Sequence, residues 1–184
     1  MSSDFSKSIE ANAILLPLNK EYDEVVGRFR KAYGKEDIGI TAIYKIRNKG
    51  LEEAFMKRQE SITGVRKVRP EVVEVYHGTS MVAASAIVNT GFDPARSQIA
   101  VYGKGTYASP NAYYAQRYCK DVKGKQDYSM IFLCRFLKGT HGTTPSDTPI
   151  DTTRMDYCGA DSILVTPYAD GIVPDYLLFY YSWQ

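Results

Sequence analysis

The sequence predicts a single α+β domain, and three observations support this. The length of 184 residues suits one domain, because domains average roughly 150 residues. Hydrophobic residues make up 44% and charged residues 24% of the chain, a globular composition that excludes wholesale disorder, collagen-like repeats and coiled coil. Segments with the helical period of about 3.6 residues lie between segments that alternate as strands do, and no repeat or linker divides them.

The first third of the chain predicts two helices and one strand. Residues 1–7 are small and polar, so we expect residues 1–10 to be flexible and structure to begin near Ile14. Asn19 is placed to cap a helix that stops at Gly34, and a second helix follows Asn48. Between them, alternation over residues 38–46 predicts a strand with one apolar face, formed by Ile38, Ile40, Ala42, Tyr44 and Ile46.

The rest of the chain predicts strands separated by short helices. A strand over residues 72–76 leads into the trio His77, Gly78 and Thr79. Thr79 or Ser80 can cap the helix that follows, which stops at Gly91. A short helix is expected at 111–120, strands at 128–137, 162–166 and 175–182, a turn at 169–171, and loops at 93–100 and 140–153.

Charge, cysteine content and hydropathy narrow the class of protein. A formal net charge of +2 is too balanced for a surface built as a whole to bind nucleic acid, and the basic run at 66–69 is interpreted as a solvated connector. Three cysteines without a C-x-x-C pair or a signal peptide indicate a reducing intracellular compartment, cytoplasmic or nuclear. Apolar runs fall short of the roughly 20 residues of a membrane span. We therefore expect no membrane binding. The two histidines lack the spacing of a metal site, so we expect no metal binding either.

Two motifs are candidates for chemistry. Residues 103–108 formally match the dinucleotide fingerprint G-x-G-x-x-[GA], and Asp127 lies at the ribose-binding spacing. The series of alternating strands and helices that a doubly wound sheet requires is missing, which disfavours this interpretation. The second motif is the trio at 77–79. A strand that ends at Gly78 exposes the N–H and C=O of that residue with no side chain in the way, which suits a primary amide such as the carboxamide of nicotinamide.

Five segments in order carry a resemblance to a known family: Val75 to Thr79, Gly91 to Asp93, Tyr102 to Tyr107, Ile131 to Gly139 and Ile172 to Leu178. Together they resemble the catalytic domain of poly(ADP-ribose) polymerases, closest to its mono-ADP-ribosyltransferase branch. The segment from Tyr22 to Ile62 resembles the lead-in of that branch. The resemblance therefore covers nearly the whole chain, as one catalytic domain over residues 1–184 without a regulatory helical subdomain. It implies the ADP-ribosyltransferase fold, a split and mostly antiparallel sheet with flanking helices, which uses NAD+ as co-substrate and no metal.

The resemblance also implies roles for individual residues. His77 would hydrogen-bond a ribose hydroxyl of NAD+, and Gly78 would hold the carboxamide through its backbone, with Thr79 beside them. Tyr107 and Tyr118 would line the two faces of the nicotinamide ring. In the loop that covers the donor, Arg96 would contact the pyrophosphate or the adenosine. The catalytic triad would consist of His77, Tyr107 and Ile163.

Two positions depart from the family pattern in ways that bear on activity. Ile163 stands where polymerising members carry a glutamate, and it has no acceptor atom to orient a ribose hydroxyl or to deprotonate an acceptor sugar. Ala115 stands where the family usually has a serine that hydrogen-bonds the nicotinamide amide. Losing one neutral hydrogen bond costs about 0.5–1.5 kcal/mol, which corresponds to about tenfold in NAD+ affinity at most. Ala108 and Ser109 also replace a Phe-Ala pair.

These residues predict an enzyme that moves a single ADP-ribose from NAD+ to an acceptor and releases nicotinamide. The sequence does not determine the acceptor, which is a side chain of another protein, the protein itself or nucleic acid. It does not determine the oligomeric state either. The alternative is a pseudoenzyme that binds NAD+ or ADP-ribose, or serves as an interaction module, and has lost turnover through the changes at positions 115 and 163.

Overall fold

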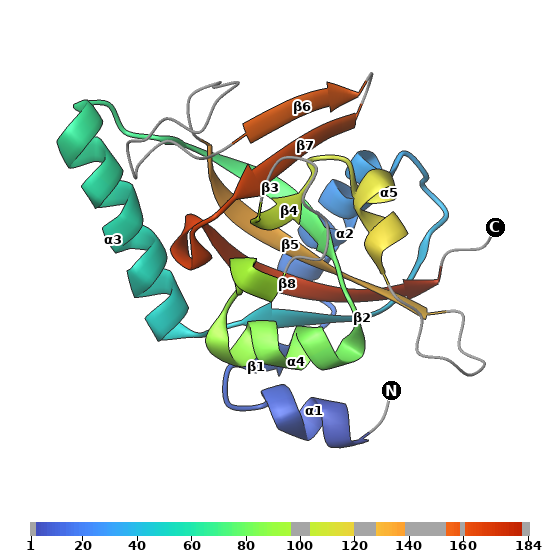
Figure 1. Ribbon diagram of the computed structural model, residues 1–184. Coiled ribbons are helices and arrows are strands. Elements are labelled where there is room, and N and C mark those ends of the chain that lie inside the picture. Colours follow the sequence, from blue (N-terminus) through green and yellow to red (C-terminus); the bar gives the residue numbers. More distant parts are fainter. Residues whose placement is uncertain (1–2, 97–103, 120–127, 139–153, 159–160, 182–184) are drawn as a thin grey trace.

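Two antiparallel sheets form the centre of the molecule in the computed structural model (Figure 1). The structure describes residues 3–96, 104–119, 128–138, 154–158 and 161–181. The larger sheet has the order β1-β2-β8-β5-β3, with the strands Ala13–Leu15, Gly39–Ile46, Ile172–Tyr181, Tyr128–Lys138 and Glu71–Gly78. The smaller sheet has the order β4-β7-β6, with the strands Thr106–Ala108, Asp161–Thr166 and Arg154–Cys158. All described strand pairs are antiparallel, so the predicted split, mostly antiparallel α+β architecture is confirmed.

Helices cover both faces of the larger sheet (Figure 1). On one face α1 (Ser3–Ile9) and α4 (Met81–Thr90) pack over a core that contains Phe132 and Leu177. On the other face α2 (Lys20–Tyr33) and α5 (Ala112–Ala115) pack over Ile131 and Leu178. Successive side chains of a strand point to opposite faces, so β5 and β8 are buried on both sides. A further helix, α3 (Lys49–Arg66), packs through Phe55 against the ends of these two strands.

The ends of the helices follow the predicted local signals. The Asn19 side chain accepts a hydrogen bond from the Tyr22 amide at 3.1 Å, and Gly34 ends α2 with a left-handed φ of 79°. Asn48 and Ser80 cap α3 and α4 in the same way. Three short 3-10 turns complete the described elements: η1 (Pro94–Arg96), η2 (Gln116–Tyr118) and η3 (Ala169–Gly171).

The strand β2 does not have the single apolar face that its alternation predicts. Its register against β8 shifts between Ile40 and Ala42, and one extra residue turns the side chains that follow to the other face. Ile40 accordingly packs on the α2 side, whereas Ala42 and Tyr44 pack on the α4 side. Ile43, fully buried on the α2 side, belongs to the core although the alternation places it outside.

The N-terminal segment is the main correction to the predicted fold. The expectation that residues 1–10 are flexible, with structure beginning near Ile14, is wrong from residue 3 onward, because Ser3–Ile9 forms α1. Phe5 and Ile9, spaced one helical turn apart, are buried in the core that they share with α4. The sequence does not predict the strands β1, β4 and β6 either.

Some predicted features lie outside the described residues, among them the loop at 140–153, Asp127 and residues 97–100 of the loop at 93–100. In the described part of the chain, no helix combines the length and the apolar character that crossing a membrane requires.

Arg135 of β5 ties α3 to the sheet. Its guanidinium donates hydrogen bonds to Glu52 of α3 at 3.0 Å and to Asp175 of β8 at 2.9 Å, and it lies 5.4 Å from the centre of the Phe55 ring. Burial raises the pKa of the Asp175 carboxyl, and Arg135 opposes this shift. One cation therefore satisfies two carboxylates that belong to different elements.

Candidate active site

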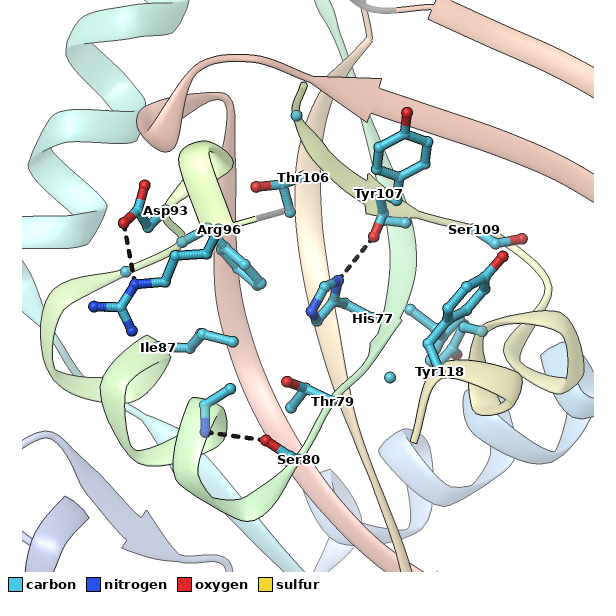
Figure 2. A pocket seen from close by; sticks show the side chains of 18 of the residues that line it. His77, Thr79, Ser80, Ile87, Asp93, Arg96, Thr106, Tyr107, Ser109 and Tyr118 are labelled. Carbon is cyan, nitrogen blue, oxygen red and sulfur yellow. Dashed lines mark hydrogen bonds and ion pairs between the residues drawn. The ribbon is translucent and has the colours of Figure 1, made fainter. Parts of the chain in front are cut away.

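A cavity of about 540 Å³ opens where the end of β3 meets β4 and β7 (Figure 2). Its other walls are α4 with the following segment to η1, and α5 with η2. The structure brings together all of the residues that the sequence analysis proposes for the site, since each of them lines this cavity: His77, Gly78, Thr79, Arg96, Tyr107, Ala115, Tyr118 and Ile163.

The two sheets are joined by a backbone bridge at one side of the cavity. Tyr76 of β3 and Ser109, which follows β4, exchange both backbone hydrogen bonds, at 2.7 and 3.0 Å. In a continuing antiparallel ladder the next pair would be Gly78 and Tyr107. That pair is not formed, because Tyr76 and Ser109 make an isolated bridge and the Tyr107 carbonyl bonds the His77 ring, while the other edge of β4 pairs with β7. The ladder between the two sheets therefore divides at this point.

The division leaves the end of β3 with an open edge. Alternate residues of a strand present their backbone groups on the same side, so the N–H and C=O of Gly78 point as those of Tyr76 do, away from β5 and toward the cavity. The Gly78 backbone can therefore pair with the amide of a ligand that lies beside it, where the ladder does not continue.

Gly78 has a steric reason to be glycine that the sequence alone does not predict. A Cβ atom at this position would collide with the carbonyl oxygen of Ala115 and would lie 3.0 Å from the amide nitrogen of Cys119. The end of β3 thus packs directly against the backbone of α5 and η2. Because Gly78 has no side chain, its backbone can lie this close to α5 and η2, the elements that carry Ala115 and Tyr118.

The His77 imidazole is held in one tautomer. Its Nδ1 lies 2.8 Å from the carbonyl oxygen of Tyr107, and because a carbonyl only accepts, Nδ1 carries the hydrogen. Burial lowers the pKa of His77 below its usual value of 6.5, although the hydrogen bond to Tyr107 opposes the shift. At neutral pH the ring is therefore uncharged, and its Nε2 is left with a lone pair that can accept a hydrogen bond.

Two tyrosines and two apolar residues also line the cavity. Tyr107 lies on β4 and Tyr118 on η2 (Figure 2). The Tyr118 side chain is partly exposed, and its hydroxyl lies within hydrogen-bonding distance of that of Tyr114, at 3.3 Å. Ala115 and Ile163 are buried in the wall and bring no polar side-chain atom to it.

Arg96 lies on η1 at another part of the wall, with an exposed side chain. Its Nε donates to the Asp93 carboxylate at 3.2 Å, and Asp93 in turn accepts a hydrogen bond from the Ala95 amide at 3.0 Å. Asp93 thus fixes both the start of η1 and the direction of the guanidinium.

Several lining residues were not proposed from the sequence, notably Phe92, Tyr114 and Ser109. Phe92 lies inside the quoted Gly-Phe-Asp motif, but only the folded chain shows that its ring packs on His77. The helical spacing of Tyr114 and Tyr118, four residues apart, is a signal that could have revealed their pairing. Among the described side chains, no group of three histidines, cysteines or acidic residues is placed to hold a metal ion.

An open strand edge that suits an amide, beside a neutral histidine and two tyrosines, agrees with the site that the resemblance to ADP-ribosyltransferases implies. Residues 19–159 match the poly(ADP-ribose) polymerase catalytic domain, and the chain belongs to this family.

Curated relatives agree with this assignment. The human protein mono-ADP-ribosyltransferase PARP11 is 31% identical over 89% of this chain and 58% of its own length. A probable poly(ADP-ribose) polymerase of Dictyostelium discoideum is 27% identical over 95% of this chain and 54% of its own. The human protein mono-ADP-ribosyltransferase PARP14 is 26% identical over 89% of this chain, which covers 10% of that protein. The chain thus spans little more than half of the first two relatives.

Proposed function

We propose that this protein is an NAD+-dependent mono-ADP-ribosyltransferase that moves one ADP-ribose unit to an acceptor and releases nicotinamide. The observation that carries the proposal is the convergence of the Gly78 backbone edge, the His77 imidazole and the Tyr107 ring on one cavity. The names of the human relatives, both mono-ADP-ribosyltransferases, support it.

In this proposal NAD+ binds with its nicotinamide at the divided ladder. The carboxamide accepts from the N–H of Gly78 and donates to its C=O, while Tyr107 and Tyr118 line the two faces of the ring. His77 accepts a hydrogen bond from a ribose hydroxyl through Nε2, with Thr79 beside it. Arg96 contributes positive charge toward the pyrophosphate or the adenosine.

The proposed reaction breaks the bond between ribose C1′ and the nicotinamide nitrogen. The electron pair of that bond leaves with nicotinamide, which becomes neutral, and positive charge develops on the ribose. The acceptor then forms a bond to C1′, and an acceptor that carries a proton at the attacking atom releases it to solvent. The protein contributes by holding the ring and the ribose in the geometry that bond cleavage needs and by keeping the cation from water until the acceptor arrives.

Ile163 limits the proposed activity to single transfers. Its apolar side chain lies in the cavity wall and cannot accept a hydrogen bond from the hydroxyl of a second ADP-ribose. An acceptor that carries its own negative charge does not need such help. We propose a protein side chain, on this chain or another, as the acceptor, and a terminal phosphate of nucleic acid is the second candidate.

The competing function is NAD+ or ADP-ribose binding without turnover. Ala115 favours it, because a wall that lacks a hydroxyl at this position holds the carboxamide with fewer hydrogen bonds.

Incubation with NAD+ labelled in its adenylate half distinguishes the two functions. For the enzyme we expect free nicotinamide together with label on protein or nucleic acid, and we expect both to be lost in a folded His77→Ala variant. Saturable NAD+ binding without nicotinamide release would reject the enzyme and leave the binding module.

A further inference from the structure

The motif Gly91-Phe92-Asp93 borders the cavity, and its central residue, Phe92, has no part in the function proposed above. Gly91 ends α4 with a positive φ of 82°, and its amide donates to the Ile87 carbonyl at 2.9 Å. Asp93 starts η1 and pairs with Arg96. Between these two turns Phe92 points inward and is only 4% exposed. The backbone on either side therefore aims one aromatic ring into the cavity wall.

The ring of Phe92 packs on the imidazole of His77. Their centres lie 5.0 Å apart with an angle of 79° between the planes, which is an edge-to-face contact. Phe92 also contacts Phe132 edge-on, with 6.1 Å between the ring centres. Phe132 is fully buried on β5 and is the register partner of His77. The three rings form one continuous cluster, and His77 is its only polar member.

The hydrogen bond to Tyr107 alone does not determine the orientation of the imidazole. The Tyr107 carbonyl keeps the hydrogen on Nδ1 only while the ring holds its present orientation. A half-turn about the Cβ–Cγ bond exchanges the positions of carbon and nitrogen atoms and breaks this hydrogen bond. A neutral imidazole can place its hydrogen on either nitrogen. A closely packed aromatic neighbour removes the space that these alternatives need.

We propose that Phe92 is a positioning residue, which holds His77 with Nδ1 toward the Tyr107 carbonyl and Nε2 toward the ribose of NAD+. The identity of this ligand rests on the proposed function, whereas the orientation of the ring does not. Phe92 and Phe132 also exclude water from the imidazole, which is consistent with the lowered pKa of His77 because burial disfavours the charged ring. Of the described residues that line the cavity, only Asp93 and Arg96 have side chains charged at neutral pH, and they pair with each other.

The test compares Phe92→Leu, which removes the ring but keeps an apolar side chain, with Phe92→Tyr, which keeps the ring. The matched control is Phe5→Leu. Phe5 is equally buried, at 5%, in the same core and packs edge-on against Phe179 with 5.7 Å between ring centres, but it does not line the cavity. A loss that comes only from core packing will therefore appear in both leucine variants.

The first measurement is the tautomer of His77 by long-range proton–nitrogen NMR at neutral pH. The chain has two histidines, so a His141→Gln background isolates the signals of His77. We expect the hydrogen on Nδ1 when Phe92 and Phe5 are both unchanged, and also in the Phe92→Tyr and Phe5→Leu variants. In Phe92→Leu we expect a mixture of the two tautomers. An unmixed Nδ1–H signal in Phe92→Leu would overturn the proposal, whatever the activity.

The second measurement is nicotinamide release as a function of pH. For Phe92→Leu we expect kcat/KM to fall roughly tenfold, with the acid limb of its profile moved to higher pH because water reaches the imidazole. Phe5→Leu should keep the profile of the wild type. If the wild type itself releases no nicotinamide, the proposed transferase activity fails, and the NMR result alone then decides the role of Phe92.

Discussion

Gly78 combines two requirements in one residue, an open backbone edge and a close approach to α5. We predict that Gly78→Ala destabilises the fold by about 1–3 kcal/mol, the usual range for overpacking, since its methyl group would collide with the Ala115 carbonyl. Relief of the collision moves α5 and η2, so nicotinamide binding should weaken as well. Urea unfolding and calorimetric titration with nicotinamide measure the two effects.

The matched control is Gly64→Ala, in α3, where an added Cβ atom has nothing within 4 Å. Alanine is a better helix former than glycine by about 1 kcal/mol, so this variant should be as stable as the wild type or more stable. If Gly78→Ala behaved like Gly64→Ala, the close packing of β3 on α5 would be contradicted.

Ala115 is the residue at which the wall of the cavity can be changed most directly. We predict that Ala115→Ser raises the affinity for nicotinamide by up to about tenfold, because a hydroxyl on this wall can donate one neutral hydrogen bond to the carboxamide. Competition binding with nicotinamide and with pyridine, which lacks the amide, provides the measurement and its control. Equal gains for both ligands would show that the hydroxyl acts on packing and not on the amide.

At the scale of elements, the attachment of α3 depends on Arg135. Replacing it with methionine keeps much of the packing on Phe55 but leaves Glu52 and Asp175 without their shared partner. We predict that Arg135→Met lowers the free energy of unfolding by about 2 kcal/mol at neutral pH, the scale of hydrogen bonds to charged groups. Lys138 lies on β5 like Arg135 and makes an exposed ion pair with Glu71 of β3. Lys138→Met should cost less than about 1 kcal/mol.

The effect of Arg135→Met should also depend on pH in a defined direction. Burial raises the pKa of Asp175 in the folded protein, and Arg135 opposes the shift. Without Arg135 the pKa rises further above its value in the unfolded chain, so the deprotonated carboxyl disfavours folding as the pH increases. The loss of stability, measured by urea unfolding, should be larger at neutral pH than near pH 4.5. A loss that is equal at both pH values would mean that Asp175 is not its source.

Elements with local signals could be predicted from the sequence, whereas those fixed by distant contacts could not. Asn19, Gly34 and Asn48 act on their own helices, and the predicted ends agree with the structure. The helix α1 escaped prediction because the partners of Phe5 and Ile9 lie on α4 and β8. At the site, the order of the motifs predicted which residues line the cavity. The division of the ladder next to Tyr76 and Ser109 could not be predicted, because it depends on strands that are far apart in the chain.

At the scale of the whole molecule, the cavity depends on the placement of one sheet against the other. Ala108 and Leu164 of the smaller sheet are buried in the same core as Val75 and Phe132 of the larger one. The bridge between Tyr76 and Ser109 adds backbone hydrogen bonds to this contact. The walls that carry His77, Tyr107 and Ile163 are therefore parts of one packed unit and need no further domain to bring them together.

This unit offers little that could support chain growth on a first ADP-ribose. Among the described lining residues the only carboxylate is that of Asp93, which pairs with Arg96, and Ile163 is apolar. We predict that incubation with NAD+ adds ADP-ribose only as single units, each on a separate acceptor residue. Intact mass followed by peptide mass analysis counts the units at each attachment site, with His77→Ala as the unmodified control. A modified residue that carries two or more linked units would show that the cavity activates the hydroxyl of a bound ADP-ribose without a carboxylate at position 163, and the explanation of single transfer by Ile163 would then be wrong.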